Sequence, residues 1–174
     1  IKIVAISARN INKKRQFKIN KKIFYKNSLD IFNKTKVDIL FEAIGQSDGV
    51  SKKIVETALK SKIHVITPNK ALISKHGNEL AKIAEQNNVN LEFEASVAGG
   101  IPILRSIKEG LATNKISKVY GILNGTSNYI LSEMENSNQS FADVLKKAQK
   151  LGYAEPGNPK LDLNGFDAFA KVRI

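Results

Sequence analysis

The sequence contains no cysteine and only four prolines among its 174 residues. The absence of cysteine excludes disulfide bonds, thiolate metal sites and a cysteine nucleophile within these residues. No run approaches the roughly 18 consecutive apolar residues of a membrane-spanning helix, and no signal peptide is recognisable. Hydrophobic residues make up 42% of the chain, which is typical of a soluble globular protein.

Acidic residues are also scarce, because 16 Asp and Glu stand against 28 Lys and Arg and give a formal net charge of +12. Such a charge is compatible with nucleic-acid binding. The lysines are spread along most of the chain, however, and the one dense cluster, at residues 13–22, contains Phe17 as its only aromatic. Stacking on bases usually needs more aromatic side chains. We interpret the charge as compositional bias and keep a basic nucleic-acid-binding module as the alternative.

Short apolar runs alternate with helical periodicity over the first hundred residues. The predicted strands are residues 1–7, 37–44, 63–67 and 89–94, and the predicted helices are residues 51–60 and 73–86. Alternating strands and helices, with apolar strands, are typical of a parallel sheet covered on both faces. The sequence therefore predicts an α/β fold with a doubly wound parallel sheet.

The pattern changes after Ser96. Helices are predicted at residues 101–112, 126–135 and 141–151, a strand at 116–123, a turn-rich connector at 152–163 and a last helix from Gly165. We place a domain boundary near residues 96–100 and expect domains at 1–98 and 99–174. Because the first strand opens the chain and the last helix runs to its end, we expect an interior piece of a longer protein.

The end of the first predicted strand is rich in cations. A glycine-rich phosphate loop follows the first strand of a dinucleotide-binding sheet, but no G-x-G-x-x-G occurs in this sequence. If residues 1–7 are the second strand, that loop lies upstream. An acidic residue that binds the ribose of NAD is expected after the second strand, whereas Arg9 and the cations of residues 13–15 follow it here. An arginine fork suits a 2′-phosphate and favours NADP, although a solvated basic loop explains the same residues.

Five blocks of sequence resemble one known family. They are TPNKAL at 67–72, EASVAGGIPI at 94–103, GILNGTSNYIL at 121–131, LGYAEP at 151–156 and DLNGFDAFAK at 162–171. In this order and spacing they resemble homoserine dehydrogenases over nearly the whole chain. The resemblance implies a partial Rossmann-type NAD(P)-binding domain followed by part of an α+β substrate and dimerisation domain. It also implies NADP-dependent interconversion of L-homoserine and L-aspartate 4-semialdehyde in threonine, methionine and isoleucine biosynthesis, with NAD as a possible second cofactor.

The last block places Asp167 and Lys171 four residues apart on one face of a helix. Taken alone, this is the spacing of an ordinary salt bridge, with Asn164 capping the helix. The resemblance implies that Lys171 is the general acid/base, that Asp167 and Glu155 hold the substrate ammonium group, and that Asp162 supports them. A lysine suits this role only if burial or a neighbouring cation lowers its pKa.

Lys70 follows a predicted strand at the carboxyl edge of the sheet, where ligands of such folds bind. By itself it is equally a solvated lysine at a helix start, but the resemblance places it beside the nicotinamide and the substrate as a further catalytic residue. Ile44, Gly45 and Pro68 are implied as other cofactor contacts. Gly45 would let the backbone approach the cofactor closely, and a plain turn glycine is the alternative.

Residues 94–101 offer one carboxylate and a run of backbone carbonyls in a short turn. Hard oxygen ligands of this kind suit an alkali or alkaline-earth cation. The resemblance implies a sodium ion bound at Glu94, Val97, Gly99 and Ile101, and a glycine hinge between the domains is the structural alternative. Residues 124–126 (Asn-Gly-Thr) predict a turn followed by a helix N-cap, a structural role.

The connector after Glu155 departs from the family pattern. It is about one residue longer than usual, and Gly157-Asn158 replace an aspartate that is common there. The resemblance still implies that Lys70, Glu155, Asp167 and Lys171 line one cleft between the domains.

The family resemblance also predicts the cellular context. It implies a small-molecule substrate, no nucleic-acid or membrane partner, a homodimer when full length, and a cytoplasmic location. A non-catalytic paralogue is the remaining alternative, against which the intact Lys70, Asp167 and Lys171 argue.

Overall fold

The structure is a computed structural model that describes residues 1–155 and 159–174. The chain divides into two compact units, Ile1–Leu104 and Arg105–Ile174. The departure at Gly157-Asn158 lies outside the described residues. Within the described part, every helix is too short or too polar to cross a membrane.

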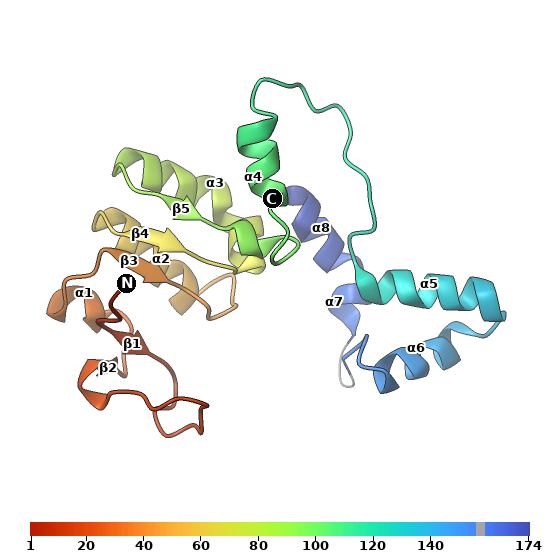
Figure 1. The fold of residues 1–174 in the computed structure, drawn as a ribbon, viewed down its shortest axis with the longest axis horizontal. Helices are drawn as coiled ribbons and strands as arrows, with labels where there is room; N and C mark the ends of the chain where they lie inside the picture. The colour runs from red at the N-terminus through yellow and green to blue at the C-terminus, as the bar shows by residue number, and fades with distance from the viewer. Residues whose placement is uncertain (156–158) are drawn as a thin grey trace. The chain divides into compact units, whose positions relative to one another are not determined.

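A three-stranded parallel sheet forms the centre of the first unit (Figure 1). Its strands are β3 (Ile39–Phe41), β4 (His64–Ile66) and β5 (Leu91–Glu92), in that order. Helix α2 (Val50–Lys60) connects β3 to β4, and helix α3 (Lys70–Gln86) connects β4 to β5. The predicted α/β fold with parallel strands is confirmed.

The core of this unit lies between the sheet and the two helices. Leu40, Val65 and Leu91 are buried at neighbouring positions of the three strands, where alternate residues point to one face. The helices bury apolar side chains at helical spacing against them: Ile54, Val55, Leu59, Leu72, Ile73 and Leu80. On the other face, Ile39, Phe41 and Ile66 are exposed. Among the described residues, helices therefore cover one face of this sheet, whereas cover on both faces was expected.

A second parallel pair, β1 (Ile6–Ser7) and β2 (Phe24–Tyr25), precedes this sheet. A short 3-10 helix, η1 (Lys21–Ile23), leads into β2, and helix α1 (Asp30–Lys34) leads towards β3. The apolar pattern of residues 1–7 predicted β1, whereas no pattern predicted β2 or α1. Both are short, and such elements give little periodic signal.

The second unit is helical in its described part. Helix α4 (Ile103–Arg105) begins in the last two residues of the first unit and continues into a π-helical turn, η3 (Ser106–Gly110), of the second. Further along are α5 (Gly125–Ser137), α6 (Phe141–Lys150), α7 (Lys160–Leu163) and α8 (Phe166–Arg173). Helices α5 and α6 pack around a small apolar core made of Ile130, Val144, Ala148 and Ala154. The rings of Tyr129 and Tyr153 stack beside it with centroids 4.5 Å apart.

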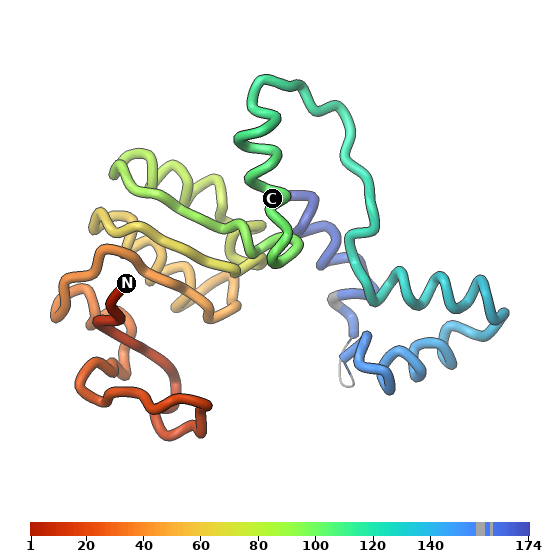
Figure 2. The backbone as a smooth tube through the Cα atoms, in the orientation of Figure 1, coloured from red at the N-terminus to blue at the C-terminus, as the bar shows by residue number. Residues whose placement is uncertain are grey.

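The strand predicted at residues 116–123 is wrong. The chain has neither helix nor strand between Leu111 and Asn124, and the tube in Figure 2 follows an irregular path there. Ile116, Val119 and Ile122 are all exposed. A strand forms only when its backbone pairs with another strand, and the described residues of the second unit contain no other strand. Apolar content alone therefore misled the prediction.

Candidate active site

Glu42 lies at the carboxyl end of β3 and is only 2% exposed. One carboxylate oxygen accepts hydrogen bonds from the main-chain N–H of Ile44 at 2.6 Å and from the Ser51 hydroxyl at 3.2 Å. The other oxygen accepts from the Thr67 hydroxyl at 2.6 Å, and the Asn69 amide donates to both oxygens at 3.3 Å. This carboxylate therefore joins the loops that follow β3 and β4 to the first turn of α2.

Asn69 fixes the turn between β4 and α3. Its side-chain oxygen accepts from the N–H of Leu72 at 3.1 Å and caps α3, while its amide donates to the Gln46 carbonyl at 2.9 Å. This cap starts the helix at Lys70, earlier than the predicted residue 73. Lys70 is partly buried there, and its N–H donates to the Pro68 carbonyl at 2.9 Å.

Gly45 has a φ of +86°, a conformation that other L-residues rarely adopt. A side-chain carbon at this position would meet no atom within 4 Å. The geometry thus has the features of both a turn glycine and a site open to a ligand. Four predicted cofactor residues, Ile44, Gly45, Pro68 and Lys70, follow neighbouring parallel strands, so they lie at one edge of the sheet.

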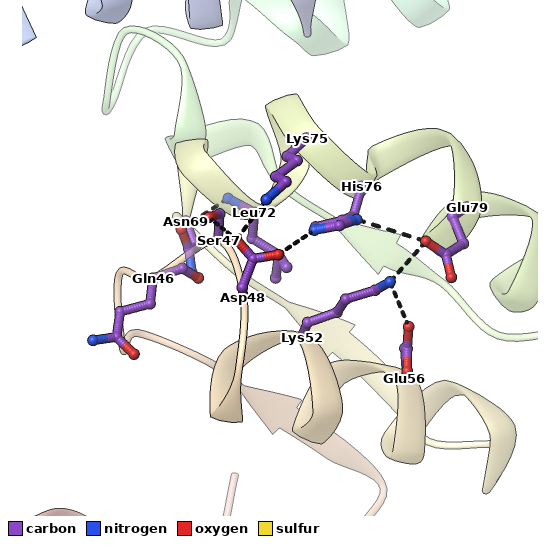
Figure 3. A network of polar contacts seen from close by, with 10 residues as sticks. All are labelled: Gln46, Ser47, Asp48, Lys52, Glu56, Asn69, Leu72, Lys75, His76 and Glu79. Atoms are coloured by element: carbon purple, nitrogen blue, oxygen red, sulfur yellow. Dashed lines mark hydrogen bonds and ion pairs between the residues drawn. The ribbon is translucent and has the colours of Figure 1, made fainter.

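A surface network ties the next part of this loop to α3 (Figure 3). Asp48 accepts from Lys75 at 2.7 Å, from the Ser47 hydroxyl at 2.6 Å and contacts His76 at 2.9 Å. The hydrogen bond from Lys75, followed by those from Ser47 and His76, holds the pKa of Asp48 well below its ordinary value of 3.8. The loop is therefore anchored to α3 by charge as well as by Asn69.

The same network joins α2 to α3. Lys52 lies between Glu79 at 3.0 Å and Glu56 at 3.3 Å. The hydrogen bond to Glu79 raises the pKa of Lys52, and that from Lys52 lowers the pKa of Glu79. All these groups are exposed enough for solvent to weaken the pairs.

Replacing Asp48 with asparagine should lower the melting temperature of the full-length protein by a few degrees at neutral pH. A carboxyl group with a depressed folded-state pKa stabilises the fold above its unfolded pKa, and this contribution is lost as the pH falls through the folded value. The difference between parent and variant should therefore shrink once the pH drops below 3.8. Thermal melts over a pH series measure it. Asp38→Asn, at an exposed aspartate, is the control, and a difference independent of pH would contradict the prediction.

A second polar cluster lies in the other unit. Asn124 donates to Asp162 at 2.8 Å and to Asp167 at 3.0 Å, so one amide holds two carboxylates. The Lys171 ammonium lies 2.7 Å from Asp167 and also donates to the Leu123 carbonyl. The Lys171 and Asp167 side chains are only 20% and 18% exposed. The salt bridge expected from their spacing is present, but it is part of a larger, partly buried cluster.

The helix termini around this cluster place its side chains. Asn124 is the N-cap of α5 because its side-chain oxygen accepts from the N–H of Ser127 at 2.8 Å. Thr126, in the first turn, donates to the Tyr153 carbonyl at 2.6 Å and lies 3.3 Å from Asp162. The Ser127 hydroxyl also donates to the Asp162 carbonyl, at 3.2 Å. These bonds attach Asp162 to the start of α5.

The predicted capping of the last helix by Asn164 is wrong. Gly165 is the N-cap of α8, with a φ of +75° and no side-chain cap bond, whereas Asn164 is the C-cap of α7. The N–H of Gly165 donates to the Asp162 carbonyl at 3.2 Å and ends α7. Because the chain reverses at this left-handed glycine, α8 starts one residue later than predicted.

Glu155 is exposed, and its main-chain carbonyl accepts from the Gln149 amide at 3.2 Å. Among the described residues, no hydrogen bond or ion pair involves its side chain. The structure therefore brings together Asp162, Asp167 and Lys171 and leaves Glu155 outside their contacts.

Arg9 is exposed after β1, and within residues 1–155 and 159–174 no hydrogen bond or ion pair involves it. The neighbouring Arg15 instead donates to the carbonyls of Asn10, Ile11 and Lys13 at 2.9, 3.2 and 2.9 Å. Arg15 therefore organises the loop through these three carbonyls, whereas Arg9 is exposed beside it.

The predicted cation ligands lie in one short stretch. Glu94 begins a 3-10 turn, η2 (Glu94–Ser96), and its carboxylate accepts from the N–H of Leu104 at 3.0 Å. Ala98 and Gly99 are consecutively left-handed, with φ of 57° and 59°. A carboxylate and the main-chain carbonyls of Val97, Gly99 and Ile101 are hard oxygen donors of the kind that suits an alkali or alkaline-earth cation. The described residues hold no cluster of three or more His, Cys, Asp or Glu side chains suited to a metal.

Comparison with known families decides between the interpretations. Residues 1–94 match the family model described as homoserine dehydrogenase, NAD binding domain, and residues 102–174 match the one described as homoserine dehydrogenase. The chain belongs to the homoserine dehydrogenase family. The family predicted from the five sequence blocks is confirmed, and neither the nucleic-acid-binding module nor the non-catalytic paralogue is favoured.

Several homoserine dehydrogenases resemble this chain closely. The one from Neisseria gonorrhoeae is 51% identical over 72% of the chain, which spans 29% of that relative. The one from Bacillus subtilis is 40% identical over the whole chain, which spans 40% of it. The crystal structure of a homoserine dehydrogenase from Thiobacillus denitrificans matches 97% of this chain and 38% of its own length, with 40% identity and a TM-score of 0.83. The chain thus spans well under half of these homoserine dehydrogenases.

A more distant structure extends the comparison. A hyperthermophilic archaeal homoserine dehydrogenase in complex with NADPH shares 25% identity with this chain. It covers 95% of the chain and 48% of its own length with a TM-score of 0.77. The fold is therefore kept at much lower identity.

Two residues that organise the polar clusters of this family member, Glu42 and Asn124, were not predicted from the sequence to do so. Glu42 lies inside a predicted apolar strand, and a carboxylate three residues before Gly45 was the available signal. Asn124 was predicted to be structural only, whereas its amide also holds Asp162 and Asp167. The available signal was an asparagine at a helix N-cap, because the cap uses only the side-chain oxygen and leaves the amide group to donate elsewhere.

Proposed function

We propose that the full-length protein containing this chain catalyses the NADP-dependent interconversion of L-homoserine and L-aspartate 4-semialdehyde. The observation that carries this proposal is the cluster of Asn124, Asp162, Asp167 and Lys171, which combines a proton donor with anchored carboxylates in a chain of this family. Threonine, methionine and isoleucine biosynthesis is the corresponding metabolic role.

Lys171 is the proton donor in this proposal. When bound, the nicotinamide supplies the hydride that reduces the aldehyde carbon. Lys171, as an ammonium, gives a proton to the carbonyl oxygen, and its neutral amine takes that proton back in the oxidation of homoserine. Asp167 and the Leu123 carbonyl hold Nζ in place. Asp167 together with Glu155 supplies negative charge for the substrate ammonium group, and Asp162 supports Asp167 through Asn124.

The cofactor site is proposed at the sheet edge of the first unit. Ile44, Gly45, Pro68 and Lys70 contact the nicotinamide half, and Lys70 also reaches the substrate. Arg9 pairs with the 2′-phosphate, since it is exposed and uncommitted among the described residues. The NADPH bound by the archaeal relative supports this choice, and NAD remains a weaker alternative cofactor.

Further properties belong to the same proposal. A sodium ion at Glu94, Val97, Gly99 and Ile101 agrees with the hard oxygen donors of that turn. Replacing sodium by choline at equal ionic strength should then lower the melting temperature, and Glu94→Gln should abolish the difference. We also propose that the full-length protein is a homodimer in the cytoplasm. The predicted domain boundary near residues 96–100 lies a few residues before the division of the chain between Leu104 and Arg105.

The test of the activity uses the purified full-length protein. L-Homoserine and NADP should produce NADPH and L-aspartate 4-semialdehyde, followed by NADPH absorbance and by mass spectrometry of the product. D-Homoserine is the matched control, because it carries the same functional groups with the opposite configuration at the α-carbon. A protein that binds NADPH but converts no L-homoserine would refute the proposal.

A further inference from the structure

Glu42 forms the only buried carboxylate link between the two loops at the proposed nicotinamide site among the described residues. We propose that Glu42 is a positioning residue, whose carboxylate sets the spacing of the Ile44–Gly45 loop and the Pro68–Lys70 turn and thereby the affinity for NADP(H). The inference rests on the proposed function, because it assigns the architecture of the same cofactor site.

The burial of Glu42 calls for a reason beyond stability. Taking a carboxylate out of water is costly unless it is well hydrogen-bonded, and an apolar residue could fill the same space without that cost. Within residues 1–155 and 159–174, its partners are all neutral: a main-chain N–H, two hydroxyls and an amide. The carboxylate therefore acts as a shared acceptor rather than as half of an ion pair.

The two oxygens of Glu42 serve different loops. Oε1 accepts a hydrogen bond from the N–H of Ile44, and Oε2 accepts one from the Thr67 hydroxyl. Both are 2.6 Å long and are the shortest hydrogen bonds that Glu42 accepts. The Asn69 amide spans both oxygens at 3.3 Å and reaches the Gln46 carbonyl at 2.9 Å, which closes the arrangement. The separation of the two loops is thus set by the width of a single carboxylate.

The residues next to these bonds are the proposed cofactor contacts. Gly45 directly follows Ile44, while Pro68 and Lys70 flank Asn69. A glutamine at position 42 keeps the shape of the side chain but replaces one acceptor with a donor. That donor must face either the Ile44 N–H or the Thr67 hydroxyl and the Asn69 amide, so one loop loses its acceptor.

The test compares Glu42→Gln with the unsubstituted full-length protein. At a temperature where both are fully folded, we expect the KM for NADP and the Kd for NADPH to rise roughly 5- to 100-fold, the cost of one buried unsatisfied donor. NADPH fluorescence titration gives the Kd without any turnover. Glu92→Gln is the matched control, since Glu92 is an exposed carboxylate on the neighbouring strand β5, and it should leave both constants unchanged.

A purely structural role gives a different pattern. It lowers the melting temperature and the active fraction, and thus the apparent kcat, but leaves the KM for NADP and the Kd for NADPH at parental values, which would overturn the inference. If Glu42→Gln does not fold, Thr67→Val replaces it, because valine has the shape of threonine and lacks the hydroxyl that Glu42 accepts. Failure of the proposed function appears separately, as an unsubstituted protein that converts no homoserine, and the NADPH titration still decides the role of Glu42.

Discussion

Replacing Lys171 with alanine should lower kcat of the full-length enzyme by about 10²–10⁴, the usual effect of removing a positioned acid/base. The NADPH affinity should change much less, because in the proposed function Lys171 acts on the substrate oxygen. Lys171→Arg should be almost as impaired, since an arginine keeps the charge but does not give up its proton at working pH. Steady-state kinetics and NADPH titration measure both quantities.

The control for Lys171 is another lysine paired with a carboxylate in the same unit. Lys147 on α6 forms an ion pair with Glu133, whose hydrogen bond raises the pKa of Lys147. Lys147→Ala removes a similar pair at an exposed site and should leave kcat near the parental value. Near-normal turnover in Lys171→Ala would reduce Asp167 and Lys171 to an ordinary salt bridge.

Replacing Arg9 with glutamate should weaken NADP binding by roughly 10- to 100-fold or more, the range for loss of charge-assisted hydrogen bonds. The affinity for NAD should change little, because NAD has no 2′-phosphate. The variant removes a guanidinium that makes no bond or ion pair within the described residues, so the fold should not be affected. Titration of the full-length protein and the variant with each cofactor gives the change in the ratio of NADP to NAD affinity.

Lys14→Glu separates direct contact from general charge. Lys14 is an exposed cation in the same loop, and its reversal alters the local potential by the same two charges as Arg9→Glu. A solvated basic loop predicts similar effects for the two variants, weakened at high salt. An equal loss of NADP and NAD affinity in Arg9→Glu would show that Arg9 does not contact the 2′-phosphate.

The elements predicted well are those whose signal is local. Helices α2 and α3 were predicted to within a few residues because they combine apolar periodicity with a length of several turns. Strands β3 and β4 are shorter than predicted, because only three residues of each strand pair through the backbone with the other strand. The strand at residues 116–123 failed for a related reason, because pairing depends on a second strand that no local pattern reveals.

The organising residues of the polar clusters depend on distant parts of the chain. Glu42 bonds Thr67 and Asn69, 25 and 27 positions away, and Asn124 bonds Asp162 and Asp167, 38 and 43 positions away. Sequence motifs identified the chemical groups, Asp162, Asp167 and Lys171, but not the side chains that orient them. A buried acceptor or an unused amide donor becomes visible only once the fold brings its partners near.

Leu123 and Asn124 are consecutive residues, and they bind opposite charges of the same ion pair. The carbonyl of Leu123 holds the cation of Lys171, while the amide of Asn124 holds the anion of Asp167. Both lie where an irregular segment meets the first turn of α5. Inserting one residue between Leu123 and Asn124 should therefore disrupt the ion pair, because it would move the carbonyl that accepts from Lys171 away from the amide that donates to Asp167.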